Sequence, residues 1–469
     1  MNRVSQKLVR TWVDLGPRFL PFADAATPDL PLSRLLRLSL FQVSVGMALV
    51  LLLGTLNRVM IVELNVPASL VAIMISLPVI YAPFRALIGF RSDTHRSALG
   101  WRRVPYIWMG AMVQFGGLAV MPFALLVLSG GGNASHWPAW VGQAGAAIAF
   151  LLVGACLHTT QTAGLALATD IAPVESQPNV VGLMYVMLLA GTIVSALVFG
   201  ALLADFSPAR LVQVIQGAAV VTLALNSIAL WKQETRNPAR HRDRNAPVQA
   251  APTFRDSWQT FITGAQARRR LIAIGLGTMA FSMGDVLLEP YGGQVLGMSV
   301  GATTSLTATL ALGGLMGFSL ASNILSRGFD PFRMAIAGLW IGVPAFAAVV
   351  VSTPLDSVMV FTLGVLMIGF GGGIFGHGTL TATMNRAPRH QIGLALGAWG
   401  AVQATAAGIA VAIGGIARDT VSSMVTHGVF GPGWTGPAIG YAFVYSVEIV
   451  LLMVTISIMA ALVGGPARA

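Results

Sequence analysis

The chain has 469 residues, of which 55% are hydrophobic and only 10% are charged, and its mean hydropathy is +0.76. These values exclude an ordinary soluble globular protein. The single cysteine excludes a disulfide framework and a thiol metal cluster.

Apolar stretches of about 20 residues, long enough to cross ~30 Å of hydrocarbon, recur along the whole chain. They predict twelve membrane-spanning helices, at residues 38–62, 66–89, 104–128, 140–169, 180–204, 211–231, 271–297, 301–325, 332–352, 357–384, 392–417 and 436–463. The 53 glycines fit this prediction, because small residues let membrane helices pack closely. The sequence therefore predicts an all-α polytopic membrane protein.

The spans divide into two groups of six. Residues 232–270 are rich in Pro, Asn and alternating charges, as expected of a solvated linker. The predicted organisation is a tail at 1–37, a six-helix half at 38–231, the linker, and a second six-helix half at 271–463. The two halves share short, weakly similar motifs at corresponding positions, such as DIAP and NRAP near the ends of spans four and ten. Two pseudo-symmetric halves indicate a major facilitator-like architecture, with a site between them near the midplane.

The basic residues are unevenly distributed. Twenty-four of the 28 Lys and Arg residues lie in the tails, the linker and the loops that fall on the same side of the predicted spans. Because cytoplasmic loops retain Lys and Arg, we expect both termini and the linker to be cytoplasmic. The net charge of +11 is then better matched to anionic lipid headgroups than to nucleic acid. Residues 8–22 mix aromatic and arginine side chains, which fits either an interfacial anchor or a solvated tail.

The loop after the second span concentrates charge. Arg85, Asp93, Arg102 and Arg103 lie in or beside it, and Gly89-x-x-x-Asp93 resembles the loop between helices two and three of major facilitators. Asp93 would lie at the end of the second span, close to the ends of other helices and to several arginines. We therefore expect these charges to serve folding or gating rather than ligand contact.

Ionisable residues inside spans cost about 2.5–3.5 kcal/mol each on insertion scales, so each needs an explanation. Arg58 and Glu63 lie near the outer end of the first span, and Asp285 and Glu289 lie in the outer half of the seventh. These spans would be counterparts in the two halves, so Arg58 could pair with Asp285 or Glu289 and latch the outer side. Glu63 and Glu289 could instead be hydrated interfacial residues. Pro290 predicts a break or kink near Glu289.

Two histidines lie in the middle of matching spans, beside glycines. His158 shares a polar stripe with Thr162 in span four, and His377 shares one with Gly373 and Thr381 in span ten. A neutral imidazole can ligate a metal centre, including the magnesium of a chlorin ring, or hydrogen-bond to a neighbouring helix. The three glycines ending at Gly373 leave room for a large flat group or a close helix.

The sequence shows no enzymatic motif. It lacks a Walker-type loop, H-E-x-x-H and G-x-S-x-G, and the glycine-rich segment 371–378 lacks the strand context of a dinucleotide loop. We therefore expect neither catalysis nor a nucleotide cofactor.

Four segments carry a more specific resemblance. They read FLPFADAA (19–26), LLRLSLFQVSVGMALVLLLGTLNRVMIVEL (35–64), APFRALIGFRSDTHRSALGWRRVPYIW (82–108) and DVLLEPYGGQVLGMSV (285–300). The chain resembles the PucC/LhaA family, the bacteriochlorophyll-delivery relatives of major facilitators in purple phototrophic bacteria. The resemblance runs from about residue 17 to the end of the chain.

The resemblance implies twelve helices, a location in the bacterial inner (intracytoplasmic photosynthetic) membrane, and a role in assembling light-harvesting antennae. The chain would bind or deliver bacteriochlorophyll to nascent antenna polypeptides, of LH1 rather than LH2. Further partners would be reaction centre–LH1 intermediates, pigment-biosynthesis enzymes and membrane lipids, with no nucleic acid. His158, His377, Gly373, Thr162 and Thr381 would form a pigment groove, in which either histidine could be the axial ligand of the chlorin magnesium.

Two other functions stay open at this point. One is a proton- or ion-coupled transporter of a small organic solute, with Arg58, Asp285 and Glu289 as coupling groups. The other is a chaperone of antenna helices that never binds pigment. The scarcity of charge near the midplane counts modestly against the transporter, because ions and polar solutes need charged or strongly polar partners.

Overall fold

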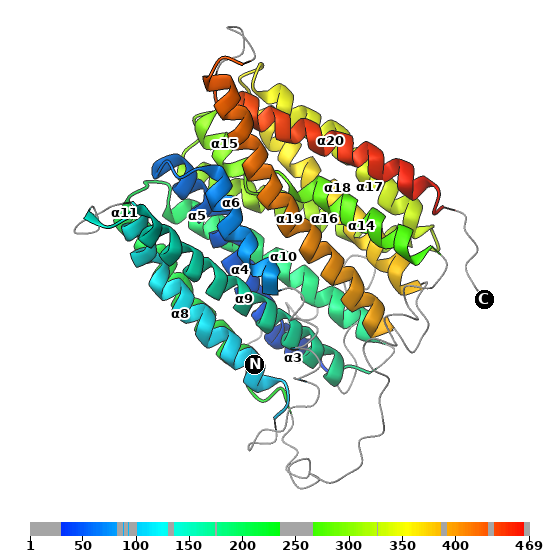
Figure 1. Cartoon of the computed structure of the whole chain (residues 1–469). Coiled ribbons are helices and arrows are strands. Elements are labelled where there is room, and N and C mark those ends of the chain that lie inside the picture. Colours follow the sequence, from blue (N-terminus) through cyan, green and yellow to red (C-terminus); the bar gives the residue numbers. More distant parts are fainter. Residues whose placement is uncertain are drawn as a thin grey trace, which may run out of the picture.

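The computed structural model describes residues 30–81, 88, 92, 101–129, 136–173, 176–234, 266–325, 327–385, 392–429 and 436–463. These residues form a helical bundle, in which an N-terminal half coloured blue to cyan-green lies beside a C-terminal half coloured green to red (Figure 1). The predicted all-α fold is confirmed.

The described helices of the first half are α3 (Leu32–Leu38), α4 (Leu40–Leu49), α5 (Leu56–Arg58), α6 (Ala68–Ser76), α8 (Val104–Leu128), α9 (Ala139–Ile171), α10 (Gln177–Leu202) and α11 (Pro208–Leu230). Those of the second half are α14 (Ala267–Ser282), α15 (Leu288–Gln294), α16 (Val300–Leu325), α17 (Pro331–Ser352), α18 (Val358–Asn385), α19 (Ile392–Thr426) and α20 (Ala438–Ala460). Two π-helical segments, η2 (Val50–Thr55) and η3 (Val59–Glu63), flank α5, and the 3₁₀ segment η4 (Leu77–Tyr81) follows α6.

Ten helices in the described part of the chain are long and apolar enough to cross a membrane. The first of them runs from Leu32 to Glu63 and includes both π segments. The second predicted span is described as far as residue 81, as α6 followed by η4, and the seventh is divided into α14 and α15. Ten long spans and these two shorter ones are consistent with the predicted twelve.

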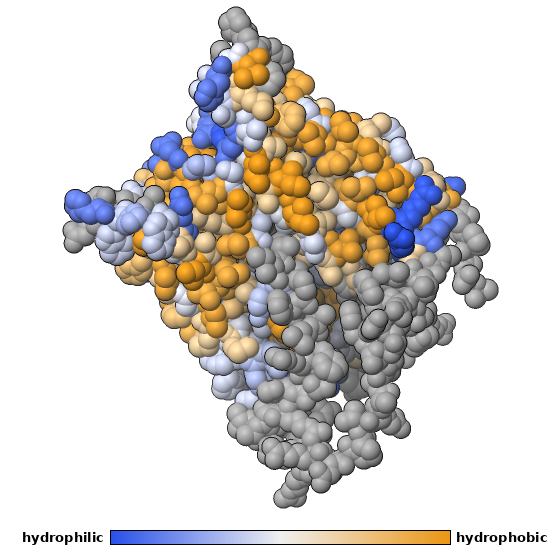
Figure 2. All heavy atoms as spheres, in the orientation of Figure 1, coloured by the Kyte–Doolittle hydropathy of each residue, from blue (hydrophilic) through white to orange (hydrophobic). Residues whose placement is uncertain are grey.

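The surface agrees with a membrane location. Hydrophobic side chains cover much of the visible face, and hydrophilic ones gather toward the extremities (Figure 2). Large apolar residues are well exposed, for example Phe123 at 63%, Trp140 at 66% and Met359 at 73%. An apolar surface of this extent in a bundle of spanning helices faces lipid rather than water. The chain is therefore a multi-pass membrane protein.

The helices pack through close backbone contacts. A Cβ atom on Gly313 of α16 would lie 2.1 Å from the Leu366 carbonyl oxygen of α18, and one on Gly338 of α17 would lie 2.6 Å from that of Gly371. Only glycine fits such approaches. Lipid tails are as apolar as the side chains, so dispersion contacts between closely packed helices stabilise this half more than burial from water does.

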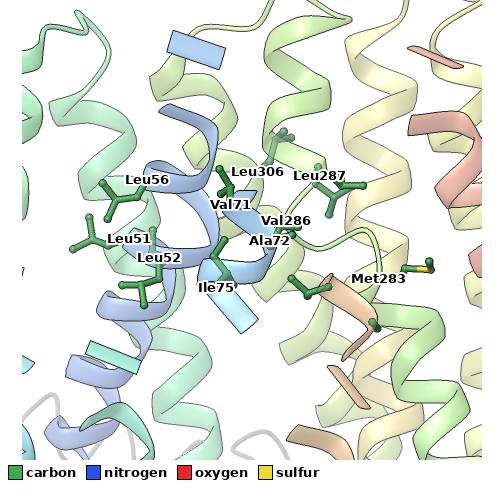
Figure 3. Packing of buried hydrophobic residues seen from close by; sticks show 14 of the residues in the cluster. Leu51, Leu52, Leu56, Val71, Ala72, Ile75, Met283, Val286, Leu287 and Leu306 are labelled. Carbon is green, nitrogen blue, oxygen red and sulfur yellow. The ribbon is translucent and has the colours of Figure 1, made fainter. Parts of the chain in front are cut away.

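One apolar core crosses the junction between the halves. Figure 3 shows Leu52 and Leu56 of the first span near Val71 of α6 and Leu306 of α16. The two halves also meet along α10 with α16 and along α6 with α19. We call the end of the bundle that carries Arg102, Arg103 and Glu234 the arginine end, and the end beyond Glu63 and Gln294 the distal end.

Candidate functional site: a cavity beside the broken seventh span

The seventh span is interrupted inside the bundle. Helix α14 ends at Ser282 and α15 begins at Leu288. Pro290 explains the interruption, because its ring lacks an N–H and clashes with the carbonyl four residues earlier in a continuous helix. That carbonyl belongs to Val286, and it accepts a hydrogen bond of 2.5 Å from the Asn57 side chain of the other half instead.

The position of the break differs slightly from the prediction. The sequence indicated a break near Glu289, and the structure has it at residues 283–287. Glu289 and Pro290 already belong to the first turn of α15. A proline is tolerated there, because the first N–H groups of a helix have no partner within it.

A cavity of about 450 Å³ lies beside this break and between the two halves. Helices α9 and α10 contribute to it from the first half, and α14, α16, α18 and α19 contribute from the second. Its lining consists of Gln161, Tyr185, Thr278, Phe281, Ser282, Asp285, Leu310, Ile368, Gly369, Gly372, Phe375, Trp399, Gly400, Gln403, Ala404 and Ala407. A site between the halves agrees with the general arrangement of this architecture.

The chemistry of the lining is mainly aromatic and small apolar. Among the described residues, four aromatic rings and three glycines surround the space, and Asp285 is the only ionisable side chain of the lining other than Tyr185. The Trp399 ring is fixed by a hydrogen bond of 3.2 Å from its Nε1 to Thr379 Oγ1. An apolar cavity with a few convergent polar groups suits an organic ligand with a large flat surface.

The predicted polar stripes lie elsewhere. His158, Thr162, His377 and Thr381 are not part of the lining. The His377 ring packs against Phe318 with centroids 4.2 Å apart, and its Nδ1 is buried without a hydrogen-bond partner among the described residues. The structure therefore does not bring the two histidines together at this cavity.

The three consecutive glycines of α18 point in different directions. A Cβ on Gly373 would lie 2.3 Å from the Gly314 carbonyl oxygen of α16, and one on Gly371 would lie 2.7 Å from the Gly338 carbonyl oxygen of α17, so both glycines serve close helix packing. Gly372 faces the cavity, where a Cβ would meet only Phe281 at 3.7 Å. Successive helical residues are about 100° apart, so one glycine in the run reaches the open space.

The Arg58 side chain contacts a carboxylate of its own half and a backbone carbonyl of the other half. It pairs with Glu63, and its Nη2 donates to the Met298 carbonyl at 3.3 Å. Asp285 is not an ion-pair partner of Arg58 in the described structure and lines the cavity instead.

Glu289 is 3% exposed and near enough to Arg58 to interact electrostatically. It accepts a hydrogen bond of 2.5 Å from Thr307 Oγ1. It is therefore a buried residue, which excludes the alternative that it is hydrated at the interface. A Cβ on Gly54 would lie 2.3 Å from Glu289 Oε1, so the glycine makes room for this carboxyl group.

Sequence reasoning missed two polar contacts that close the distal end. Asp419 of α19 accepts a hydrogen bond of 2.6 Å from the Ser69 N–H of α6, which joins the two halves. Arg418 donates to Gln294 Oε1 at 2.6 Å and lies over the Tyr441 ring, 4.6 Å from its centroid. Consecutive charged residues inside an apolar stretch were the available signal.

The predicted charges at the arginine end form a cluster. Asp170 pairs with Arg102 and with Arg103, the latter at 3.0 Å. The Glu234 carboxylate accepts from the backbone N–H groups of Arg102 at 2.6 Å and Val104 at 3.0 Å, at the start of α8. A carboxylate at a helix N-terminus is favourable. Arg85 and Asp93 lie outside the described residues.

Comparison with known proteins identifies relatives. The family described as PUCC protein matches residues 55–466. The chain is 64% identical over 421 residues to Protein PucC of Rhodovulum sulfidophilum, covering 90% of this chain and 92% of that protein. It is 27% identical over 407 residues to the Bacteriochlorophyll synthase 44.5 kDa chain of Rhodobacter capsulatus. That match covers 82% of this chain and 87% of that protein.

A solved structure supports the fold. A bacterial homologue of the human lysosomal transporter Spinster, in an inward-facing and unoccupied conformation, matches with a TM-score of 0.67 at 14% identity. The match covers 91% of this chain and 95% of that one. The major facilitator-like architecture is thereby confirmed.

Proposed function

Because the chain belongs to the PUCC protein family, we propose that it is a light-harvesting antenna assembly factor. It binds bacteriochlorophyll and delivers it to nascent antenna polypeptides, those of LH1 rather than LH2, in the intracytoplasmic photosynthetic membrane. The name of the relative from Rhodobacter capsulatus supports the link to this pigment. The arginine end faces the cytoplasm in this proposal, because it carries the basic loops.

The cavity between the halves is the observation that carries the proposal. Its volume of about 450 Å³ lies within the range of about 300–1,000 Å³ that is usual for organic ligands. Phe281, Phe375 and Trp399 offer ring faces and edges for stacking against a macrocycle. Gln161 and Gln403 supply amide groups for its polar substituents.

The donor set also fits the pigment's magnesium. The described residues of the lining include no histidine, so an amide oxygen of Gln161 or Gln403 would hold the magnesium within the cavity. Oxygen ligands suit magnesium. The pigment groove around His158 and His377 stays a separate prediction, which a His377→Leu variant tests by the position of the bound pigment's absorption band.

A pair of glycine variants tests the cavity. Gly372→Leu places a large side chain in the open space, whereas Gly376→Leu adds the same side chain one turn along α18, where a Cβ meets nothing within 4 Å. Each protein is solubilised gently, and its pigment is measured by absorption. We expect the unaltered protein and Gly376→Leu to retain bacteriochlorophyll and Gly372→Leu to lose most of it. Equal pigment in both variants would remove the cavity from the proposal.

The same preparation separates the alternative functions. Antenna polypeptides that accompany a protein without pigment would support the pigment-free chaperone. Absence of both pigment and antenna polypeptides, together with uptake of a small solute by reconstituted vesicles, would support the transporter. Co-purification of pigment with antenna polypeptides supports the assembly factor.

A further inference from the structure

A second carboxyl group lies directly behind the break in the seventh span. Glu448 of α20 is 0% exposed, and its Oε1 accepts a hydrogen bond of 2.6 Å from the Gly284 N–H. The Met283 amide also faces this carboxyl group. Its Oε2 is buried and has no hydrogen-bond partner among the described residues. One oxygen of a fully buried acid is therefore left for a proton or another ligand.

The backbone is shaped around this acid. A Cβ on Gly284 would lie 2.9 Å from Glu448 Oε2 and 2.6 Å from Tyr445 Cε1. The carboxyl group therefore points at the break itself. The neighbouring Asp285 lines the cavity on the same stretch of chain, and the two acids are near enough to interact electrostatically.

No cation of the described structure neutralises this pair. Helix α20 packs against α14, α17 and α19. The only ionisable residue of α17 is Arg333, exposed at the arginine end, and the arginines of α14 lie in its first turn at that same end. From α19, Arg418 is engaged by Asp419 at 2.8 Å and by Gln294.

The remaining ionisable neighbours are tyrosines. Tyr291 of α15 bonds to the Val349 carbonyl at 3.0 Å, and Tyr441 donates to Gln294 Oε1 at 2.7 Å. The Tyr445 hydroxyl, one turn before Glu448 on α20, is buried without a partner among the described residues. Hydroxyl groups can carry a proton onward but cannot balance two negative charges.

We propose that Asp285 and Glu448 form a proton-binding pair, which holds one exchangeable proton on its two interacting carboxyl groups and exchanges it through the cavity. Two carboxylates that interact in a low-dielectric interior cannot both stay ionised at an acceptable energy, whereas a singly protonated pair can. Glu448 supplies the buried oxygen, and Asp285 connects it to the open space. Glu448 lies outside the lining of the cavity proposed for the pigment, whereas Asp285 belongs to that lining.

Loss of the proton would change the conformation of the break at residues 283–287. With both groups ionised, repulsion opposes the approach of Asp285 to Glu448. Residues 284–287 lie outside both helices and resist a shift mainly through turn bonds, such as that from the Leu287 N–H to the Gly284 carbonyl at 2.8 Å. Proton occupancy therefore biases the position of α15 relative to α14. This is a two-state element that a proton can switch.

Infrared difference spectroscopy between acidic and alkaline buffer tests the site on purified protein without pigment. The carbonyl stretch of a protonated buried carboxyl group appears in such a spectrum. We expect Glu448→Gln to abolish the band and to reduce proton uptake by about one per chain. The Gln side chain keeps an oxygen for the Gly284 N–H, so the fold is retained. Asp285→Asn should shift or remove the same band, because the charge of Asp285 acts on Glu448.

Glu289→Gln is the matched control, since Glu289 is equally buried but lies near Arg58 and Thr307. It should leave the band of the pair in place. A band that survives both Asp285→Asn and Glu448→Gln, or that disappears only in Glu289→Gln, would overturn the proposal. A signal that follows sodium concentration at constant pH would overturn it as well. Pigment content, read separately by absorption, keeps this result independent of the proposed function.

Discussion

The first and seventh spans would be counterparts in the two halves, yet they handle buried polar groups in opposite ways. The first span is continuous from Leu32 to Glu63 and keeps its backbone hydrogen bonds through two π-helical segments. The seventh is broken at residues 283–287 and passes its freed backbone groups to other helices, Val286 to Asn57 and Gly284 to Glu448.

The π segment explains why Arg58 finds a carboxylate partner within its own helix. In an α-helix, residues five apart point about 140° away from each other. In η3 the bonds follow the i to i+5 pattern, as between the Leu64 N–H and the Val59 carbonyl at 3.0 Å. That pattern places Glu63 beneath Arg58, and the two pair.

The difference shows where each half is sensitive to change. The first span depends on one buried cation, and the seventh depends on groups supplied by its neighbours. Four sets of substitutions test this comparison.

Replacing Arg58 should have the largest effect. Arg58→Leu leaves the buried Glu289 without a nearby cation, and breaking such a site costs about 3 kcal/mol of unfolding free energy. Glu63→Gln should cost less than about 1 kcal/mol, because the Glu63 side chain is 36% exposed and water replaces its partner. Denaturant unfolding in mixed micelles measures both. Equal losses would mean that the pair with Glu63, rather than Glu289, is what Arg58 stabilises.

Adding one methyl group to the break should come next. Gly284→Ala forces a Cβ to within 2.6 Å of Tyr445 and should cost about 2 kcal/mol. Gly275→Ala, in the preceding helix α14, meets only Val402 at an ordinary 3.5 Å and should be neutral or stabilising by up to about 1 kcal/mol. The same unfolding measurement applies. A tolerated Gly284→Ala would show that the carboxyl group of Glu448 can leave the break at little cost.

Removing the amide that joins the two spans should have a moderate effect. Asn57→Ala leaves the Val286 carbonyl buried and unsatisfied, at about 1–2 kcal/mol. This bond joins the two halves of the protein. The loss of stability should therefore be accompanied by faster proteolysis where the halves meet. Unchanged stability and unchanged cleavage would indicate that water or another donor replaces Asn57.

The smallest effect should come from Pro290→Ala, and it should depend on Asn57. In the unaltered background the new N–H finds the Val286 carbonyl already engaged, so stability should change by less than about 1 kcal/mol. In the Asn57→Ala background the same N–H can restore the helical bond and recover about 1 kcal/mol. A double-mutant cycle measures this coupling, and purely additive effects would contradict the proposed exchange of partners.

Much of the architecture could be predicted because it is local in the sequence. Continuous apolar stretches determine spanning helices, and the prediction of Pro290 as a breaker was right to within a few residues. The cavity was harder to predict. Gln161, Gln403 and Trp399 are unremarkable in sequence, whereas the conspicuous His158 and His377 lie outside the lining. Helix rotation decides which side of a polar stripe faces the cavity, and that depends on packing between helices.

The sequence by itself determined that this chain crosses a membrane many times in two related groups of helices, because apolar length and glycine content act on each helix separately. The partners of its buried charged groups were decided only by the tertiary structure. Arg58 is paired with Glu63 through a π-helical turn rather than with Asp285, and Glu448 meets Gly284 across a sequence separation of 164 residues. The reason is physical. A buried charged group pairs with whichever group lies within hydrogen-bond distance in the folded protein, and the packing of the helices sets the distances between such groups.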